Sequence, residues 1–282
     1  MTDYLRYFLI LLSSKAVLIS MGFVMITALA WLKYGAGSLS WGPGLRRSGA
    51  VNVGLVVFNG ATLGLVLVAT TFLLDLMQSL PHVPERVWLD MPWIIQAFTA
   101  LFILDFTNYW LHRWAHANAW FWPLHAVHHS DTDLHFLSSQ RAHILEWVVT
   151  VPLVAGAAFL CGLSVEGVAF LILIRELHQF YVHSGLDWSH GPFRHVIAGP
   201  RFHRWHHVDL PEAHNKNFSL FFPFIDMTFG TYYVPGPARG LATGFEDNPG
   251  DRLIPLLLYP FRSWAKLASV PKHKRSSMQA VD

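Results

Sequence analysis

The stretch that decides the fold is HRWAHANAWFWPLHAVHH, from His112 to His129, which places five histidines close together. It consists of an HxxxH pair, a spacer and an HxxHH triplet. A second HxxHH triplet ends at His207, and an HxxxxH pair ends at His183. The chain has 17 histidines, and their grouping at short, repeated spacings is typical of a metal centre rather than of a tag.

The spacing inside each group places imidazoles on a shared surface. Residues four apart lie on one face of a helix, and an HxxHH triplet spans roughly 100° of one face. The HxxxxH pair fits chelation only where a helix ends or the chain turns. A structural zinc takes four ligands, so ten histidines predict two metal ions with about five imidazoles each, or fewer plus water. The ten predicted ligands are His112, His116, His125, His128, His129, His178, His183, His203, His206 and His207. Imidazole suits Fe, Zn, Cu and Ni alike, so the ligands alone do not choose the metal.

Polar residues near the first histidines are candidates for orienting them. Asp105 and Asn108 precede His112 by seven and four residues, on the same stripe of a helix. A carboxylate commonly accepts the second N–H of a ligand imidazole, and an aspartate within a membrane span is costly without a partner. We therefore expect Asp105 to orient a ligand, with a hydrogen bond between helices as the alternative. His143 is expected either to support the site or to contact the metal directly.

The composition indicates a bilayer environment. Charged residues make up 13% of the chain and hydrophobic residues 53%, with a mean hydropathy of +0.35, whereas soluble domains carry about 25% charged residues. The formal net charge of +2 is too small to suggest a nucleic-acid partner. The single cysteine, Cys161, excludes an internal disulfide, a Cys-rich zinc site and a Cys-ligated iron–sulfur cluster.

Three apolar stretches, 4–32, 51–80 and 92–111, are each long enough to cross a bilayer, which needs about 20 residues. A signal peptide is the alternative for the first, but that stretch is too long and lacks a clear cleavage site. A fourth stretch, 147–177, has arms of only about 15 residues, which predicts a tight helical hairpin that returns to the same side. The sequence thus predicts an all-α polytopic membrane protein with three transmembrane helices, this hairpin and a cytoplasmic histidine-rich helical cap.

The charges between the spans predict the orientation. The first connection, a Gly/Ser/Pro-rich linker from Gly35 to Arg47, carries only basic charges near it, at Lys33, Arg46 and Arg47. The second connection mixes both signs. By the positive-inside rule the first connection is cytoplasmic, so the third span delivers His112 to the cytoplasmic side.

These features predict three regions: an N-terminal transmembrane region at 1–91, a catalytic domain at 92–250, and a C-terminal region at 251–282. The last begins with an apolar and basic stretch, 253–267, that is typical of an interfacial amphipathic helix. A basic tail follows from Lys272 and is predicted to be disordered.

At this point the motifs resemble those of the fatty acid hydroxylase / sterol desaturase superfamily of membrane di-iron oxygenases. The resemblance covers roughly residues 95–235. The matching segments are His112–His116, Leu124–Ser130, Arg141–Glu146, Gln179–Ser184, Phe202–His207, Asn217–Phe218 and Asp226–Tyr232. His178 departs from this pattern, because it resembles a ligand of the fatty acid 2-hydroxylase branch rather than of the bacterial branch.

The resemblance implies two iron ions as cofactor, O2 as co-substrate, and oxidation of an unactivated C–H bond in a membrane lipid. Glu146, with Asp105 and Asn108, would orient the ligands. The chain has no GxGxxG, P-loop or GxSxG motif and no fused haem domain, so a separate electron-donor protein is implied.

Other functions remain open on these motifs. Desaturation of a lipid, or cleavage of an alkyl-ether lipid, would use the same site. A metal transporter would need polar residues along several spans, whereas the histidines gather after them. A zinc hydrolase would be expected to carry HExxH or a carboxylate base beside the histidines.

Overall fold

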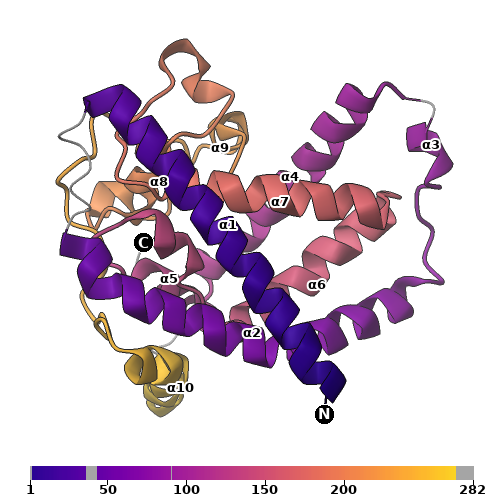
Figure 1. Ribbon diagram of the computed structural model, residues 1–282, viewed down its shortest axis with the longest axis horizontal. Helices are drawn as coiled ribbons and strands as arrows, with labels where there is room; N and C mark the ends of the chain where they lie inside the picture. The colour runs from indigo at the N-terminus through magenta and orange to yellow at the C-terminus, as the bar shows by residue number, and fades with distance from the viewer. Residues whose placement is uncertain (1, 36–42, 90, 271–282) are drawn as a thin grey trace.

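The computed structural model describes residues 2–35, 43–89 and 91–270, and within these ranges the regular elements are helices (Figure 1). One isolated β-bridge joins Val208 to Thr243. The predicted all-α class is therefore confirmed. The tail from Lys272 and part of the first linker lie outside the described residues.

Three helices are long and apolar enough to cross a membrane, as predicted, and the chain is an integral membrane protein. They are α1 (Thr2–Tyr34), α2 (Pro43–Met77) and α4 (Trp93–Ala117). Large apolar side chains point away from the body of the molecule: Val24 is 65% exposed, Val68 69% and Phe72 71%. Such a surface is suited to lipid. Helix α2 begins earlier than predicted, because a proline fits the first turn of a helix.

The predicted hairpin is present as α6 (Ile144–Leu160) and α7 (Val165–Val182). Its turn needs Gly162, which has a φ of 69°. A Cβ atom there would lie 2.2 Å from the carbonyl oxygen of Val83. A side chain at this position would therefore clash with backbone as well as strain the turn.

The two arms diverge from their turn (Figure 1), and α4 packs between them. Ala100 and Leu104 of α4 form one buried cluster with Ala158 of α6 and Leu171 of α7. On the outer sides of the two arms, α6 packs along α2, and α7 packs along α1. The boundary predicted between 91 and 92 stays a prediction, although α2 and α6 on either side of it pack together.

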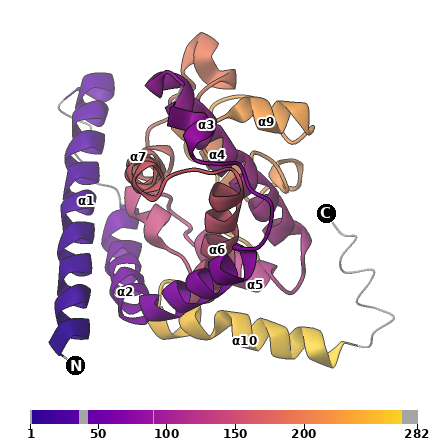
Figure 2. The same cartoon turned by 90° about the vertical axis from the view of Figure 1, so that its right-hand side faces the viewer.

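Helix α1 lies along one edge of the molecule (Figure 2) and is joined to α7 at two levels. Lys15 Nζ lies 2.6 Å from Glu176 Oε2, so the lysine in this apolar helix has a counter-charge. Further along, Gly22 lies so close to Phe180 that a Cβ atom would come within 2.6 Å of the ring. A small residue therefore permits the two helices to approach each other.

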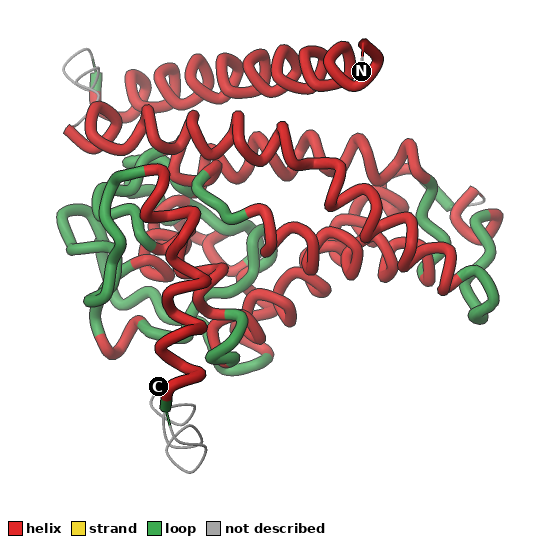
Figure 3. The backbone as a smooth tube through the Cα atoms, turned by 90° about the horizontal axis from the view of Figure 1, so that it is seen from below, coloured by secondary structure: helices red, strands yellow, loops and turns green. Residues whose placement is uncertain are grey.

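Most of the loops gather at one end of the long helices and form a cap (Figure 3). The shorter elements are α3 (Arg86–Leu89), α5 (Trp122–His129), α8 (Pro200–His207) and α9 (Pro223–Thr228), with 3-10 turns at Phe136–Gln140, Gly191–His195 and Pro211–Ala213. The predicted interfacial stretch is the helix α10 (Leu253–Ser269), which lies across the long helices beneath α5 (Figures 2 and 3). Its Leu256 is buried against Leu55 and Val127, whereas Ile254 and Phe261 are exposed.

Candidate metal centre

The structure gathers nine of the ten predicted ligands into two compact groups. Within each group one nitrogen atom of every imidazole lies within 4.8 Å of the others. The five-histidine group consists of His112, His116, His125, His129 and His206. The four-histidine group consists of His128, His183, His203 and His207.

Two short helices divide their histidines between the groups in opposite ways. Helix α5 gives His125 and His129, which are four residues apart, to the five-histidine group and His128 to the other. Helix α8 gives His203 and His207 to the four-histidine group and only one histidine to the five-histidine group. Residues at i and i+4 share a face, so each HxxHH triplet naturally serves two neighbouring sites.

The remaining members come from the ends of the hairpin and the third span. His112 and His116 occupy the last two turns of α4, which extends beyond the predicted end at Leu111. His183 directly follows α7. The long helices therefore lead straight into the two groups.

Hydrogen bonds at Nδ1 fix the rings of the five-histidine group. His112 Nδ1 lies 2.8 Å from the Phe218 carbonyl oxygen, and His206 Nδ1 lies 2.7 Å from that of Lys216. His125 Nδ1 lies 2.8 Å from Glu146 Oε1. A carbonyl or carboxylate oxygen only accepts, so each Nδ1 carries the proton and each Nε2 presents a lone pair.

The four-histidine group is fixed in the same way. His128 Nδ1 donates to the Arg141 carbonyl at 3.1 Å, and His183 Nδ1 donates to the Gln179 carbonyl at 2.8 Å. The Nε2 atoms of these two histidines then face each other at 3.1 Å with a lone pair each. Two acceptors at that distance repel unless a cation lies between them, so the donor set fits a metal ion.

The same geometry occurs in the five-histidine group, where the Nε2 atoms of His112 and His125 lie 3.0 Å apart. Other buried nitrogens of the two groups have no hydrogen-bond partner in the described part of the chain. They are His116 Nε2, His129 Nε2, His206 Nε2, His203 Nδ1 and His207 Nδ1. An unpaired buried polar atom costs roughly 1–3 kcal/mol. The presence of five such nitrogen atoms in these two groups therefore favours a bound metal ion at each group.

Burial keeps the histidines of the cap neutral. Burial, together with the neighbouring imidazoles, lowers the pKa of His128 to about 4 and that of His206 to about 3. Burial likewise lowers the pKa of His129, His203 and His207 well below the usual value. A metal ligand must be deprotonated, and these histidines are so at neutral pH.

One predicted supporting residue, Glu146, contacts a histidine directly, through the bond to His125 described above. Asp105 is placed differently: its buried carboxylate accepts the backbone N–H groups of Leu220, Phe221 and Phe222 at 2.8–3.0 Å. Asp105 therefore holds the loop that follows Phe218 in the chain. These hydrogen bonds go to backbone N–H groups and not to an imidazole.

The remaining predicted site residues also lie outside the two groups. Asn108 Oδ1 accepts from Arg175 at 3.5 Å. His143 caps the start of α6, where its Nδ1 accepts the N–H of Leu145. His178 stacks on Phe221 with ring centroids 4.3 Å apart and donates from Nε2 to a carbonyl. The structure does not bring His178 together with the other nine histidines.

Asp226 has a positioning role that the sequence analysis did not assign. Its carboxylate accepts the backbone N–H of Phe218 at 2.7 Å and of Ser219 at 2.9 Å, and the hydroxyl of Thr231. It thus fixes, with Asp105, the segment whose carbonyl holds His112. Its place in the matching segment Asp226–Tyr232 was the available signal, but backbone acceptors such as the Phe218 carbonyl cannot be recognised in a sequence.

Residues 97–231 match the family model described as fatty acid hydroxylase. This range contains the two histidine groups and the supporting residues Asp105, Glu146 and Asp226. No solved structure gives a significant match to the chain.

Several characterised proteins are similar to the chain. It is 26% identical over 178 residues to ornithine lipid hydroxylase OlsE of Rhizobium tropici and 28% over 173 residues to methylsterol monooxygenase 1-3 of Arabidopsis thaliana. It is 32% identical over 152 residues to alkylglycerol monooxygenase of Danio rerio. These alignments cover 63%, 59% and 51% of this chain, and 54%, 59% and 32% of the respective relatives. The chain therefore spans less than two thirds of the length of each of these relatives.

Proposed function

Because the chain is an oxidoreductase of the fatty acid hydroxylase family, we propose that it hydroxylates an unactivated C–H bond of a membrane lipid. The co-substrate is O2, and the cofactor is a pair of iron ions. The observation that carries the proposal is the pairing of buried imidazoles whose acceptor nitrogens face each other at 3.0–3.1 Å. Such pairs are stable only around cations.

In this proposal the five-histidine group and the four-histidine group each hold one ion. His178 is not a ligand, because its Nε2 is engaged by a backbone carbonyl. The iron pair supplies, when bound, the activation of O2 that oxidation of an unactivated C–H bond requires.

The protein's own contribution is positioning and exclusion of water. Hydrogen bonds from Nδ1 to Phe218, Lys216 and Arg141 prevent the rings of three ligands from rotating. Glu146 does the same for His125 and adds negative charge beside the centre, which makes that imidazole a stronger donor. The groups are buried, so bulk water has little access to them.

The substrate is a lipid that approaches from the bilayer. Helix α4 exposes Trp93 and Ile94 at one end and carries His112 and His116 at the other. An apolar chain lying along this helix would therefore reach the histidine groups without leaving an apolar environment. The relatives are named for ornithine lipid, methylsterol and alkylglycerol, whose common chemistry is a large hydrocarbon part.

Electrons come from a separate donor protein, and the centre faces the cytoplasm. The basic residues that flank the first connection support this orientation by the positive-inside rule. A donor bound at the cap would stand on the same side as the two groups.

The test combines metal analysis with lipid analysis in cells grown under ¹⁸O2. The full chain, its His206→Ala variant and its His178→Ala variant are compared; the last is the matched control, since His178 lies outside both groups. We expect about two irons per wild-type chain and a lipid that carries one ¹⁸O atom. His178→Ala should retain both, whereas His206→Ala should lose the product.

The alternatives give different products. A new double bond without ¹⁸O would indicate a desaturase, and release of a fatty aldehyde from an alkyl-ether lipid would indicate ether cleavage. Folded wild-type protein that binds no metal would overturn the proposal.

A further inference from the structure

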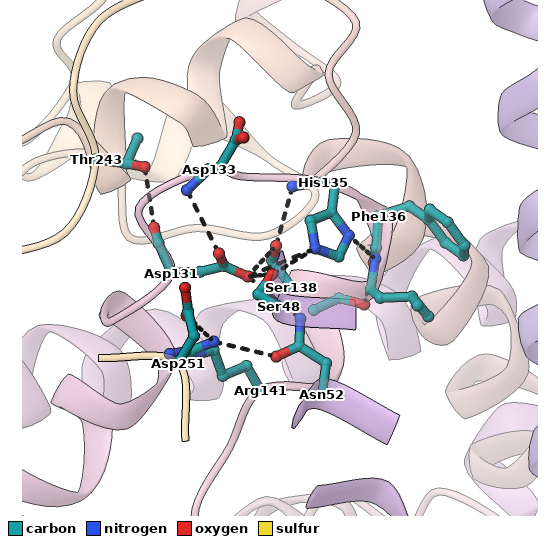
Figure 4. Close-up of polar contacts among 12 residues, drawn as sticks. Ser48, Asn52, Asp131, Asp133, His135, Phe136, Ser138, Arg141, Thr243 and Asp251 are labelled. Carbon is teal, nitrogen blue, oxygen red and sulfur yellow. Dashed lines mark hydrogen bonds and ion pairs between the residues drawn. The ribbon is translucent and has the colours of Figure 1, made fainter. Parts of the chain in front are cut away.

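A second buried polar cluster contains none of the predicted ligands (Figure 4). It lies beside the four-histidine group, because the carbonyl of its Arg141 contacts His128. We call it the Arg141 network. It consists of Ser48 and Asn52 of α2, Asp131, Ser138 and Arg141 between α5 and α6, and Asp251 just before α10. It thus joins three segments that are far apart in the chain.

At its centre the guanidinium group of Arg141 is fully buried and surrounded by acceptors. Nε donates to the Ser130 hydroxyl at 2.7 Å. Nη1 donates to Asn52 Oδ1 at 3.3 Å and to Asp251 Oδ1 at 3.0 Å, and Nη2 donates to the Gly250 carbonyl at 3.2 Å. A buried cation that loses its counter-charge is strongly destabilising, so this arrangement depends on Asp251.

The other half of the network is built on Asp131. Its Oδ2 accepts from the Ser48 hydroxyl at 3.1 Å, the Ser138 hydroxyl at 2.7 Å and Asn52 Nδ2 at 3.2 Å. Asn52 therefore bridges the two halves, because its amide nitrogen binds Asp131 while its amide oxygen binds Arg141. Through this side chain the network is anchored on a membrane-spanning helix.

The network contacts a predicted ligand through a backbone carbonyl. The backbone carbonyl of Arg141 accepts the Nδ1–H of His128 at 3.1 Å. The Nδ1 bonds of His112, His125 and His206 in the five-histidine group go instead to Phe218, Glu146 and Lys216. Of these four Nδ1 bonds only that of His128 ends on Arg141, so a shift of the Arg141 backbone would act directly on the four-histidine group.

We propose that the Arg141 network is a positioning device for His128, and that Asn52 and Asp251 thereby control metal binding by the four-histidine group. Both residues lie outside the region matched by the family, 97–231. The proposal rests on the metal binding proposed above. When the charge of Asp251 is removed, the segment that carries Arg141 moves away from its buried position, and His128 loses the acceptor that orients its ring.

The experiment uses the full chain in detergent micelles, stripped of metal and titrated with Co²⁺ alone. The variants are Asp251→Ala, Asp251→Asn, which keeps the size of the side chain, and Asn52→Ala. Asp247→Ala is the matched control: Asp247 lies four residues earlier and forms an exposed ion pair with Lys266, with both side chains 77% exposed. Circular dichroism and size-exclusion chromatography verify that each variant is folded.

We expect wild type and Asp247→Ala to bind two Co²⁺ ions with the same affinities. Asp251→Ala and Asn52→Ala should bind one of the two roughly 10–100-fold more weakly, as is usual when a residue that orients a ligand is lost. Asp251→Asn should show a smaller loss in the same site, because its amide oxygen still accepts from Arg141.

A second comparison separates positioning from a general effect on folding. In a His128→Ala background the residual Co²⁺ affinity of the four-histidine group should not fall further when Asp251→Asn is added, because His128 is the contact through which the network acts. Equal weakening of both sites, or no weakening in a folded Asp251→Asn protein, would overturn the positioning role. Wild type that binds no Co²⁺ would overturn the metal proposal itself and, with it, this role.

Discussion

His129 and His207 stack on each other with ring centroids 4.4 Å apart and an angle of 26° between the rings, although they belong to different histidine groups. This contact joins α5 to α8 at the border between the two groups. The two proposed metal ions are therefore close neighbours, yet each has its own set of ligands.

The unequal size of the groups predicts unequal effects of ligand removal. His207→Ala leaves three imidazoles in its group, whereas His129→Ala leaves four, a number that suffices for a tetrahedral ion. We expect His207→Ala to retain about one metal ion per chain and His129→Ala to retain nearly two, measured by elemental analysis of purified protein. Equal losses in the two variants would contradict the division of ligands between the groups.

Glu146 offers a test of ligand orientation. Glu146→Ala removes the acceptor of His125 Nδ1–H, and we expect a roughly 10–100-fold weaker affinity for one Co²⁺ ion. Glu146→Gln should cost less, because its carbonyl oxygen still accepts the hydrogen bond. The measurement is a titration of metal-free protein, with Glu176→Gln as a control carboxylate that contacts Lys15 and no histidine ligand. An unchanged affinity in Glu146→Ala would show that His125 needs no such support.

Much of the architecture could be predicted from the sequence, because its signals are local. The spans at 4–32, 51–80 and 92–111 appear as long helices, since hydropathy and length alone decide whether a segment can cross a bilayer. The short arms of 147–177 predicted the hairpin for the same reason. Their divergence could not be predicted, because it depends on α4 packing between them.

The sequence predicted which histidines form the site, but not how they divide into two groups or which residues orient them. The HxxHH spacing indicated that the histidines meet, but which ones share an ion depends on how α5 and α8 face each other. Asp105 lies on the stripe that the helical period predicted, yet it binds the loop 220–222, because that loop folds back over α4. His178 has the spacing of a ligand, but its ring is held by Phe221 and the Leu220 carbonyl.

The three backbone bonds of Asp105 predict a large effect on stability. Asp105→Ala leaves three buried N–H groups without an acceptor, each worth roughly 1–3 kcal/mol. We expect a loss of about 3 kcal/mol or more in the free energy of unfolding, measured by denaturation in detergent micelles. Asn108→Ala, on the same stripe but with one 3.5 Å contact, should cost about 0.5 kcal/mol or less. Similar losses in the two variants would argue against the role of the aspartate in holding the loop.

The ion pair between Lys15 and Glu176 predicts how α1 is attached. The side chains are 20% and 21% exposed, so Glu176→Ala leaves a cation with little water in an apolar helix. We expect that variant to lose about 1–3 kcal/mol of stability, between the values typical of exposed and of buried pairs. Most of the lost stability should return when the charges are exchanged in the double variant Lys15→Glu, Glu176→Lys. Thermal unfolding followed by circular dichroism measures both. If the exchanged pair is no more stable than Lys15→Glu alone, the attachment of α1 depends on packing, as at Gly22 and Phe180, and not on charge.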